Sequence, residues 1–437
     1  MSIARRFQSV KRWEKLPTTA TVHNDPPSAH RREGWGDIDL SVYSPRRPCR
    51  SSARFAGLDI NDDPTGSTSR LTIAQARTEW DVQTAFLDSC SYGPPPRRGW
   101  EALQRSLDQW RVGSVPWPRW AESVDTSREL FGRLVGVPAG QMATGAAVSQ
   151  LLAPIAAALP DGAEVLIPNI EFTSGVYPFA VHADRGMRVR TAPLDTLAEA
   201  VDASTALVSF SAAQSATGEV ADLPAITRAA RKVGALTVLD GTQTAGWLPL
   251  DAANVDFLAV AAYKWLCAPR GTAFLTMPSQ LAAADDDQPH RAEFFDRLKP
   301  LAAGWFAAGG AASYGMPMHL ADGARAFDIS PAWHSWVGTA PALELLLDVG
   351  VDRIHAHDLA LANRFRTGLG LAESNSAIVS IDLGIVDRSW PGAVDRLDAA
   401  GVRYSQAGGN MRFGFHLFND VADVDTALNA VTDAVVL

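Results

Sequence analysis

Lys264 is a lysine within an apolar stretch of a chain whose basic residues are mostly arginine. Only five of its 39 basic residues are lysines, and this one follows the run Phe257-Leu-Ala-Val-Ala-Ala-Tyr263. Burial among apolar side chains favours the neutral amine over the ammonium ion. A neutral amine can form a Schiff base with an aldehyde cofactor, although a lysine at a strand end can equally extend its charged head into water.

A carboxylate and an amide follow a predicted strand upstream of this lysine. The strand, residues 236–239, leads directly into Asp240, and Gln243 comes three residues later. The next predicted strand ends three residues before Lys264, and neighbouring parallel strands open onto one crevice at their carboxyl ends. An anion facing a protonated ring nitrogen, with a lysine for the aldehyde, is the arrangement that pyridoxal phosphate needs as an electron sink. Alone, Asp240 could equally cap a helix or a turn.

The combined motif resembles the core signature of the class V aminotransferase family. It consists of Asp240-Gly-Thr-Gln243 and, 24 residues after its aspartate, Lys264-Trp-Leu-Cys-Ala-Pro-Arg-Gly271. This family has the fold-type I architecture and includes cysteine desulfurases, kynureninase and isopenicillin epimerase-like enzymes. The resemblance, which extends from about Phe86 to the C-terminus, implies that Lys264 binds pyridoxal 5'-phosphate as a Schiff base. It also implies that Asp240 pairs with the pyridinium nitrogen and that Gln243 hydrogen-bonds the phenolic oxygen.

A turn of small residues, Ala143-Thr-Gly-Ala-Ala-Val-Ser149, opens a predicted helix over 147–158. Free backbone amides at a helix start bind phosphate, although small-residue turns of this kind are common. The family register makes Ala146 and Ala147 the amide donors. Relatives often carry a serine three residues before the lysine and a histidine one residue before it. This chain has Ala261 and Tyr263 there, so of the two only Tyr263 can donate to the phosphate through its side chain.

Two further segments follow predicted strands. Glu171-Phe-Thr-Ser resembles the family segment whose aromatic residue stacks on the cofactor ring, which assigns that role to Phe172; a core phenylalanine is the alternative. Gln214-Ser-Ala-Thr-Gly218 is in register with a segment whose asparagine touches the cofactor or substrate in many relatives. Ser215 occupies that position here.

Arg412 lies in a segment rich in aromatic residues near the C-terminus. A guanidinium group can hold a carboxylate through two parallel hydrogen bonds, although an arginine on an exposed edge strand shows the same pattern. In the family register it binds the substrate's α-carboxylate, which implies an α-amino acid or a derivative as substrate. The loop Pro269-Arg-Gly-Thr272 resembles one that approaches the cofactor of the partner subunit, so Thr272 implies a homodimer.

The reaction is less constrained than the cofactor. Transamination is the favoured interpretation, with Lys264 moving a proton between the substrate's α-carbon and the cofactor. Carbon–sulfur β-elimination of the ergothioneine sulfoxide-lyase type is an alternative, and so is epimerisation, for which no second base is identified. Residues 402–412 lack the cysteine that desulfurases carry before the arginine, which argues against a persulfide-forming desulfurase. A non-catalytic protein with a cofactor-binding fold is the least favoured hypothesis.

Alternating strands and helices must position these residues. The pattern predicts strands over 164–168, 188–193, 206–210, 236–239, 256–261, 272–277, 378–382, 402–405 and 411–415, and a short one within 84–96. It predicts helices over 100–111, 120–134, 147–158, 174–183, 223–233, 340–349 and 421–435. This order predicts a large doubly wound, mainly parallel α/β domain over 71–328, followed by a smaller α+β domain over 329–437.

Composition excludes several other classes of protein. Residues 1–70 carry 12 basic and eight acidic side chains, and their composition predicts a disordered extension. The whole chain has a net charge of −9, which argues against nucleic acid as a partner. No apolar run approaches the roughly 18 residues of a membrane span, and no signal peptide is recognised. Three scattered cysteines and the isolated His355-Ala-His357 predict neither disulfides nor a metal site, so we expect a cytoplasmic protein.

Overall fold

The computed structural model describes residues 71–278, 289–310 and 314–433, all of which belong to one compact unit of the chain. The extension predicted over 1–70 lies outside the described residues. The predicted division into two domains near residue 328 stays a prediction.

The larger sheet has seven strands among the described residues, in the order β1-β7-β6-β5-β4-β2-β3. The strands are β1 (Met142–Gly145), β2 (Glu164–Pro168), β3 (Arg188–Ala192), β4 (Thr205–Ser211), β5 (Leu236–Asp240), β6 (Phe257–Ala261) and β7 (Ala273–Thr276). Strands β3, β2, β4, β5 and β6 run parallel to one another, while β7 is antiparallel to both β6 and β1. The sheet is therefore mainly parallel, as the sequence predicted.

Alternate residues of the central strands face opposite sides of this sheet. In β6, Phe257 and Ala259 belong to one apolar cluster, whereas Leu258 and Val260 belong to the other. A period of two with both faces apolar is typical of a strand covered by helices on both sides. The doubly wound α/β architecture is thereby confirmed.

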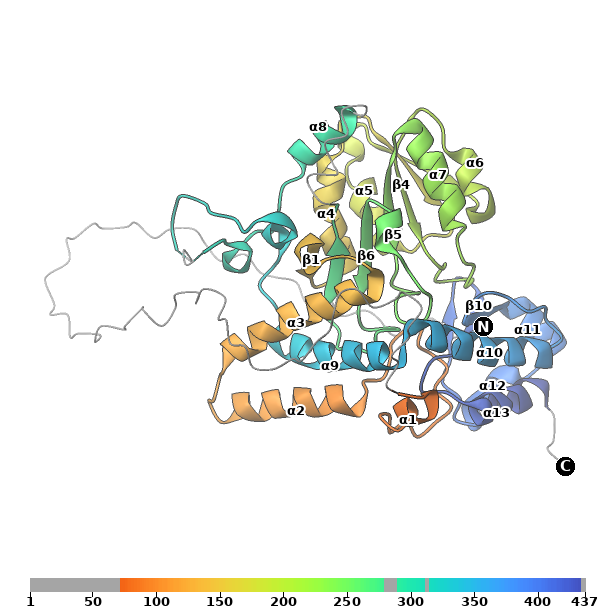
Figure 1. Cartoon of the computed structure of the whole chain (residues 1–437). Coiled ribbons are helices and arrows are strands. Elements are labelled where there is room, and N and C mark those ends of the chain that lie inside the picture. The colour runs from red at the N-terminus through yellow and green to blue at the C-terminus, as the bar shows by residue number, and fades with distance from the viewer. Residues whose placement is uncertain (1–70, 279–288, 311–313, 434–437) are drawn as a thin grey trace, which may run out of the picture. The chain divides into compact units, whose positions relative to one another are not determined.

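Helices cover both faces of the larger sheet. The cluster that contains Phe257 and Ala259 also contains residues of α4 (Val148–Ala158), α5 (Thr173–Ala180) and α8 (Pro289–Arg297). The cluster that contains Leu258 and Val260 also contains residues of α3 (Trp117–Val135), α6 (Leu197–Ala200), α7 (Leu223–Val233) and α9 (Trp333–Val349). Helix α2 (Arg97–Arg111) packs on α9, so that α2, α3 and α9 lie side by side (Figure 1). The short α1 (Ile73–Arg77) precedes them and contacts α9 and α10 (Val351–Gly368).

A second, antiparallel sheet lies in the C-terminal part of the chain, in the order β8-β10-β9. Its strands are β8 (Ile378–Asp382), β9 (Ser405–Ala407) and β10 (Asn410–Gly414), and its helices are α10, α11 (Leu383–Ser389), α12 (Ala393–Ala399) and α13 (Val421–Thr432). A third apolar cluster, which includes Phe365, Met411 and Phe413, joins this sheet to α10 and α13.

Several local predictions were wrong. Residues 84–96 form no named strand: Phe86 and Asp88 make only isolated bridges to Arg403 and Gly414, because Gly93 and three prolines interrupt the segment. The strand predicted over 402–405 is β9, shifted toward the C-terminus, and α10, α11 and α12 were not predicted. The residues interpreted as the start of a turn, from Ala143, belong in part to β1, which pairs with β7.

Candidate active site

Lys264 lies in a tight turn directly after β6. Its carbonyl accepts a hydrogen bond from the Cys267 amide at 3.1 Å, and the Gly93 amide donates to the Tyr263 carbonyl at 2.9 Å. A Cβ atom at Gly93 would lie 2.0 Å from the Lys264 carbonyl oxygen, so only glycine allows this approach. The Lys264 side chain is 8% exposed, and its burial lowers the pKa of the amine to about 8, against the opposing attraction of Asp240.

Asp240 ends β5 and is also buried. Its register partners are Ser211 on β4 and Ala259 on β6, and one of its carboxylate oxygens accepts the Thr242 amide at 2.8 Å. Burial raises the pKa of Asp240 to about 6, and no arginine, lysine or histidine among the described residues forms an ion pair with it. A buried carboxylate without a cationic partner is costly, which suits a site that receives a positively charged group.

Gln243 is fixed by three polar contacts. Its amide nitrogen donates to the Cys90 carbonyl and to the Ser215 hydroxyl, both at 3.0 Å, and its amide oxygen accepts the indole N–H of Trp265 at 2.9 Å. Ser215 also accepts from Arg412 at 3.0 Å. The structure therefore brings the predicted residues Gln243, Ser215 and Arg412 into one network.

Arg412 projects from the middle strand of the smaller sheet and is almost fully buried. Its guanidinium donates to the hydroxyls of Ser405 and Ser91, both at 3.1 Å, and to the Ser215 hydroxyl and carbonyl. No carboxylate among the described residues pairs with it. The arginine is thus oriented by neutral groups, and its charge is available to an anion.

The predicted phosphate turn lies between β1 and α4. Ala147 is the N-cap residue of α4, and no side chain caps this helix within the described part of the chain; the Ala146 amide donates to the Gln150 side chain at 3.2 Å. A Cβ atom at Gly145 would lie 2.3 Å from the Gln150 side-chain oxygen and 2.7 Å from a Leu151 methyl group, so both side chains would have to shift to admit a larger residue. The uncapped first turn is a suitable anion site.

A buried ion pair supports the strand that leads into this turn. Arg128 on α3 donates to Asp328 at 2.6 Å and to the Met142 carbonyl. Asp328 in turn accepts the Thr144 amide at 2.8 Å and the Thr144 hydroxyl at 3.0 Å. These bonds fix β1 immediately before Ala146.

Phe172 stands close to the lysine and is 50% exposed, unlike a core phenylalanine. Its ring centroid lies 5.6 Å from Lys264 Nζ. Glu171 holds the preceding backbone, because its carboxylate accepts the amides of Phe172 at 2.8 Å and of Ser211 at 2.7 Å. The ring therefore lies beside the lysine amine, where it could stack on a planar group attached to that amine.

Tyr263 and Thr272 differ in accessibility. Tyr263 is half-buried, with its ring 5.6 Å from that of Tyr92 and 4.5 Å from the Arg270 guanidinium. The Thr272 side chain is fully buried, and its hydroxyl donates to the Pro269 carbonyl at 3.0 Å. Its hydrogen-bonding capacity is used within the chain, and its predicted contact with a second subunit stays a prediction.

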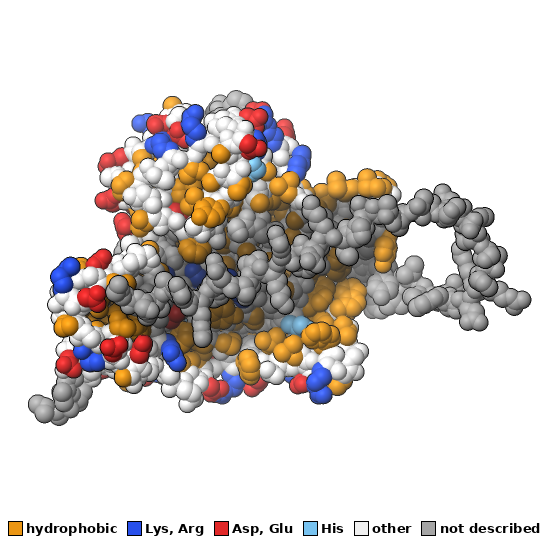
Figure 2. Space-filling view, turned by 180° about the vertical axis from the view of Figure 1, so that it is seen from behind, with side chains coloured by type: hydrophobic (Ala, Val, Ile, Leu, Met, Phe, Trp, Pro, Cys, Tyr) orange, Lys and Arg blue, Asp and Glu red, His pale blue; other side chains and the backbone are white. Residues whose placement is uncertain are grey.

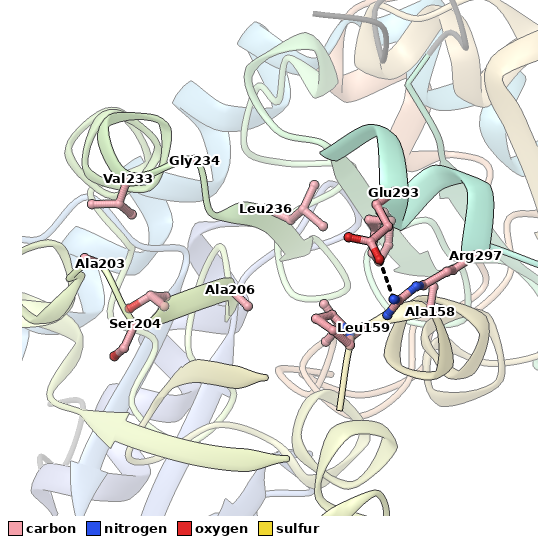
Figure 3. A pocket seen from close by; sticks show the side chains of 13 residues that line it. Ala158, Leu159, Ala203, Ser204, Ala206, Val233, Gly234, Leu236, Glu293 and Arg297 are labelled. Atoms are coloured by element: carbon pink, nitrogen blue, oxygen red, sulfur yellow. Dashed lines mark hydrogen bonds and ion pairs between the residues drawn. The ribbon is translucent and has the colours of Figure 1, made fainter. Parts of the chain in front are cut away.

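The cavity drawn in Figure 3, of about 260 Å³, lies elsewhere. It is lined by Ala206 and Leu236 at the amino ends of β4 and β5, with the ion pair of Glu293 and Arg297 on one side. Asp240 lies at the opposite end of β5, roughly 13 Å away at the usual rise per strand residue. Because ligands of such sheets bind at the carboxyl ends of the strands, this cavity does not belong to the candidate site.

Several residues of the site were not predicted from the sequence. Cys90 and Ser91 come from the segment before α2, Trp265 follows the lysine directly, and Glu171 and Ser405 act through hydrogen bonds to the predicted residues. Of these residues, only Trp265 and Glu171 could have been found from the sequence, because both lie inside motifs that resemble the family's. The others reach the site through tertiary folding.

Comparison with known proteins defines the class to which this fold and site belong. The sequence profile described as Aminotransferase class-V matches residues 120–381, more than half of the chain. The chain therefore belongs to the class V aminotransferase family, whose members are pyridoxal-phosphate-dependent enzymes that act on small amino-acid substrates.

Relatives within this family carry different activities. The chain is 28% identical over 282 residues to an uncharacterized aminotransferase of Bacillus subtilis, covering 62% of this chain and 72% of the relative. It is 26% identical to the kynureninase of Deinococcus radiodurans over 73% of this chain and 77% of that enzyme. It is also 30% identical to the isopenicillin N epimerase of Amycolatopsis lactamdurans, over 46% of this chain and 56% of that enzyme.

Solved structures agree on the fold. A cysteine desulfurase of Escherichia coli superimposes with a TM-score of 0.68 at 20% identity, covering 83% of this chain and 98% of that one. The cystine C–S lyase C-DES has the same TM-score at 19% identity, with 80% and 98% covered. A mutant of C-DES is known with glycine covalently linked to its pyridoxal-phosphate cofactor. The structural neighbours thus share the fold-type I architecture.

The cofactor of this chain is pyridoxal phosphate, and the observed residues fit it. Lys264 provides a buried amine, Asp240 a carboxylate without a cationic partner, and the start of α4 a set of backbone amides. Among the described helices, none is both long enough and apolar enough to cross a membrane.

Proposed function

We propose that this protein is a pyridoxal-phosphate-dependent aminotransferase that acts on an α-amino acid or a derivative, with Lys264 as the residue that attaches the cofactor. The observation that carries this proposal is a pair of unbalanced buried charges. Asp240 and Arg412 form no ion pair with another described residue, and Lys264 attracts Asp240 only from beyond ion-pair distance. A ring nitrogen that carries a proton and a substrate carboxylate would supply the two missing charges.

The chain's own groups then have distinct tasks. When bound, pyridoxal phosphate withdraws electrons from the substrate's α-carbon. Lys264 Nζ, whose pKa burial lowers to about 8, would accept and hold the proton of that carbon. Arg412 holds the substrate's carboxylate, and Asp240 keeps the ring nitrogen protonated through its negative charge.

The remaining predicted residues would hold the cofactor in place. The amides of Ala146 and Ala147, at the start of α4, would donate to the phosphate, with Ala146 giving up its hydrogen bond to Gln150, and the Tyr263 hydroxyl would add a further donor. Phe172, whose ring lies 5.6 Å from Lys264 Nζ, would stack on the ring, and Gln243 and Ser215, which are hydrogen-bonded to each other, would lie near its phenolic oxygen. These proposed roles are supported by the geometry described above and by the alignment of this chain with the family's motifs.

Cysteine-dependent desulfuration is disfavoured by the described cysteines. Cys90 and Cys267 are free and fully buried, and burial raises the pKa of Cys90 to about 11. A persulfide carrier needs an accessible thiolate. The remaining cysteine, Cys49, lies outside the described residues.

A product screen separates transamination from elimination. Purified holoenzyme is incubated with single amino acids and S-substituted cysteines, with and without a keto-acid acceptor. We expect amino-group transfer that depends on the acceptor. Release of ammonia, pyruvate and a thiol without an acceptor would assign the lyase reaction instead, and inversion of the α-carbon alone would assign epimerisation. Failure of the protein to take up pyridoxal phosphate would overturn the enzyme proposal itself.

We also propose that the chain forms a homodimer. An exposed apolar surface supports this proposal, and hydrophobic side chains gather on the face shown in Figure 2. Its exposed large apolar side chains include Trp305, Tyr314, Met316 and Met318, and Trp305 is in ring contact with the half-buried Trp117 and Trp333. An exposed patch of large apolar side chains is typical of a protein interface.

Light scattering at micromolar concentration tests the dimer. We expect twice the mass of one chain, and a monomer for the double substitution Tyr314→Glu and Met318→Glu. The control Val421→Glu changes an exposed apolar residue at the start of α13 and should leave the dimer intact. A monomeric native protein would contradict the proposal.

A cytoplasmic location is proposed from the free thiols Cys90 and Cys267, and recovery in a secreted fraction would contradict it.

A further inference from the structure

A fully buried ion pair lies beside the turn that carries Lys264. Asp358 on α10 and His416 after β10 are both 0% exposed. His416 Nδ1 lies 2.8 Å from an Asp358 carboxylate oxygen, and His416 Nε2 lies 2.8 Å from the Trp265 carbonyl oxygen. The pair is therefore in direct contact with the residue that follows Lys264, although neither of its members was predicted from the sequence.

Both ring nitrogens of His416 face oxygen acceptors. A carbonyl oxygen only accepts, so Nε2 carries a proton and donates it to Trp265. A proton on Nδ1 as well makes the contact with Asp358 a charge-assisted hydrogen bond. Burial lowers the pKa of His416, but the charge and the hydrogen bond of Asp358 outweigh burial and raise this pKa to about 10. The imidazolium ion therefore holds the Trp265 carbonyl throughout the neutral range.

The Trp265 carbonyl oxygen has little room to move. Gly246 has a φ of +110°, and a Cβ atom there would lie 2.6 Å from this oxygen. Two residues after Trp265, Cys267 has a φ of +52°, a left-handed conformation that is unfavourable for a residue with a side chain. Such a conformation persists only where surrounding contacts hold it. The hydrogen bond from His416 is one of these contacts.

The backbone around β10 joins this contact to Arg412. Arg412 lies on β10, and His416 follows two residues after the end of that strand. Arg412 donates to the Ser215 hydroxyl and carbonyl, beyond the end of β4, whereas His416 donates to the Trp265 carbonyl, beyond the end of β6. One short stretch of backbone is therefore bonded to the carboxyl edge of the larger sheet at two points, one of them beside Lys264.

We propose that His416, held by Asp358, is a positioning residue for Lys264. Through the Trp265 carbonyl it fixes the turn from which the lysine side chain extends, and through the adjoining backbone it sets that turn relative to Arg412. This inference rests on the proposed function, because it takes Lys264 as the residue that attaches the cofactor. It assigns neither His416 nor Asp358 a contact with the cofactor or the substrate.

Two variants that differ by one methylene group test this role. Both carry Asp358→Asn, so that no buried carboxylate is left without its cation. In this background the side chain of His416→Gln is long enough for its amide nitrogen to take the place of Nε2 and donate to the Trp265 carbonyl. The shorter side chain of His416→Asn places its amide nitrogen near the position of Nδ1. The first variant keeps the bond to the turn, and the second loses it.

The rate at which the apoprotein attaches pyridoxal phosphate, trapped at Lys264 with borohydride, measures the placement of the amine. A displacement of about 1 Å can slow a reaction that depends on placement by about 100-fold. We expect the rate above pH 8 to fall about 10- to 100-fold in Asp358→Asn with His416→Asn. With His416→Gln it should stay within about threefold of the native rate. The pH midpoint should be the same in both variants, because they carry the same charges.

A background without the lysine distinguishes positioning from general damage. In Lys264→Ala, the two variants should bind pyridoxal phosphate with the same dissociation constant in equilibrium dialysis, because the lysine that they position is gone. His357→Leu is the matched control. His357 is half-buried on the same helix and donates to the Asn419 carbonyl at 3.1 Å, so its loss should leave the attachment rate unchanged.

Gly246→Ala decides the matter if a variant at position 416 does not fold. Its Cβ atom would displace the Trp265 carbonyl without altering the ion pair of Asp358 and His416. Attachment to Lys264 should therefore slow about 10- to 100-fold in this variant as well. A native rate of attachment in Gly246→Ala would overturn the positioning role.

The outcomes separate this inference from the proposed function. If the native apoprotein attaches no cofactor, or borohydride fixes it elsewhere than at Lys264, the proposed function fails. If the native protein attaches it there, equal rates in the His416→Gln and His416→Asn variants overturn the positioning role alone. A loss of affinity for pyridoxal phosphate in the Lys264→Ala background that matches the loss of rate would overturn it as well.

Discussion

Replacing Arg412 by lysine should weaken the binding of amino acids but not of amines without a carboxylate. Three serine hydroxyls, of Ser91, Ser215 and Ser405, together with the Ser215 carbonyl, accept hydrogen bonds from the guanidinium, whose positive charge forms no ion pair with a described carboxylate. Lysine keeps the positive charge but offers a single ammonium group, so at least one charge-assisted hydrogen bond to the substrate is lost.

The size of the effect follows from the bond that is lost. A hydrogen bond to a charged group contributes about 1.5–3 kcal/mol. Because about 1.4 kcal/mol corresponds to a factor of ten, the dissociation constant of an amino acid should rise roughly 10- to 150-fold. The matching amine, which makes no contact with Arg412, should bind within about threefold of its original affinity, the usual margin for such contributions.

Spectral titration of the holoenzyme measures both ligands in one experiment. Arg366→Lys is the matched control. Arg366 is also buried and donates to the carbonyls of Ser376 at 2.8 Å and Ile378 at 2.6 Å, but it has no assigned role in substrate binding. Both substitutions should lower the free energy of unfolding, but only Arg412→Lys should change the ratio of amino-acid to amine affinity. An unchanged ratio in Arg412→Lys, or an equal change in Arg366→Lys, would refute the assignment of Arg412.

Other predictions concern the cofactor site and its supports. Because the Lys264 pKa is lowered to about 8, the rate of pyridoxal-phosphate uptake by the apoprotein should rise with pH and level off above 8; a rise that continues toward pH 10.5 would contradict this. The folded pKa of Asp240 is raised from 3.8 to about 6, so its carboxyl group stabilises the apoprotein at low pH and that contribution is lost as pH rises through 6. Asp240→Asn should therefore make the apoprotein more stable at pH 8, by up to roughly 3 kcal/mol in urea unfolding, with no gain below pH 4. Asp328→Asn leaves the buried Arg128 with only the more distant Asp125, 3.7 Å away, and should cost about 3–5 kcal/mol of stability and weaken phosphate binding, which equilibrium dialysis would show. Gly93→Ala should abolish cofactor attachment, and a normal visible band in that variant would exclude the close packing described for the Lys264 turn.

The sequence predicted the parts of the fold that depend on local pattern. Apolar strands such as β5 and β6 are buried on both faces, and their ends could be located because Asp240 and Lys264 interrupt apolar runs. Parallel strands open toward one edge, so the convergence of these two residues could be expected as well.

The rest depends on contacts that no local pattern encodes. Strand β1 consists of Met142-Ala-Thr-Gly145, which has weak strand propensity and becomes a strand only through its pairing with β7. Ser91 and Cys90 reach the site across long separations in the chain, and the segment that carries them was interpreted as a strand. The orientation of Gln243 could not be inferred, because it depends on an indole 22 residues further on.

Borohydride reduction of the native holoenzyme, followed by peptide mass analysis, tests the central claim most directly. The chain has five lysines, so attachment at any one of them is resolved by digestion. We expect the reduced cofactor on the peptide that contains Lys264, and no stable adduct in Lys264→Ala. Attachment at Lys232 or Lys299, or an unmodified protein after reduction, would contradict the account.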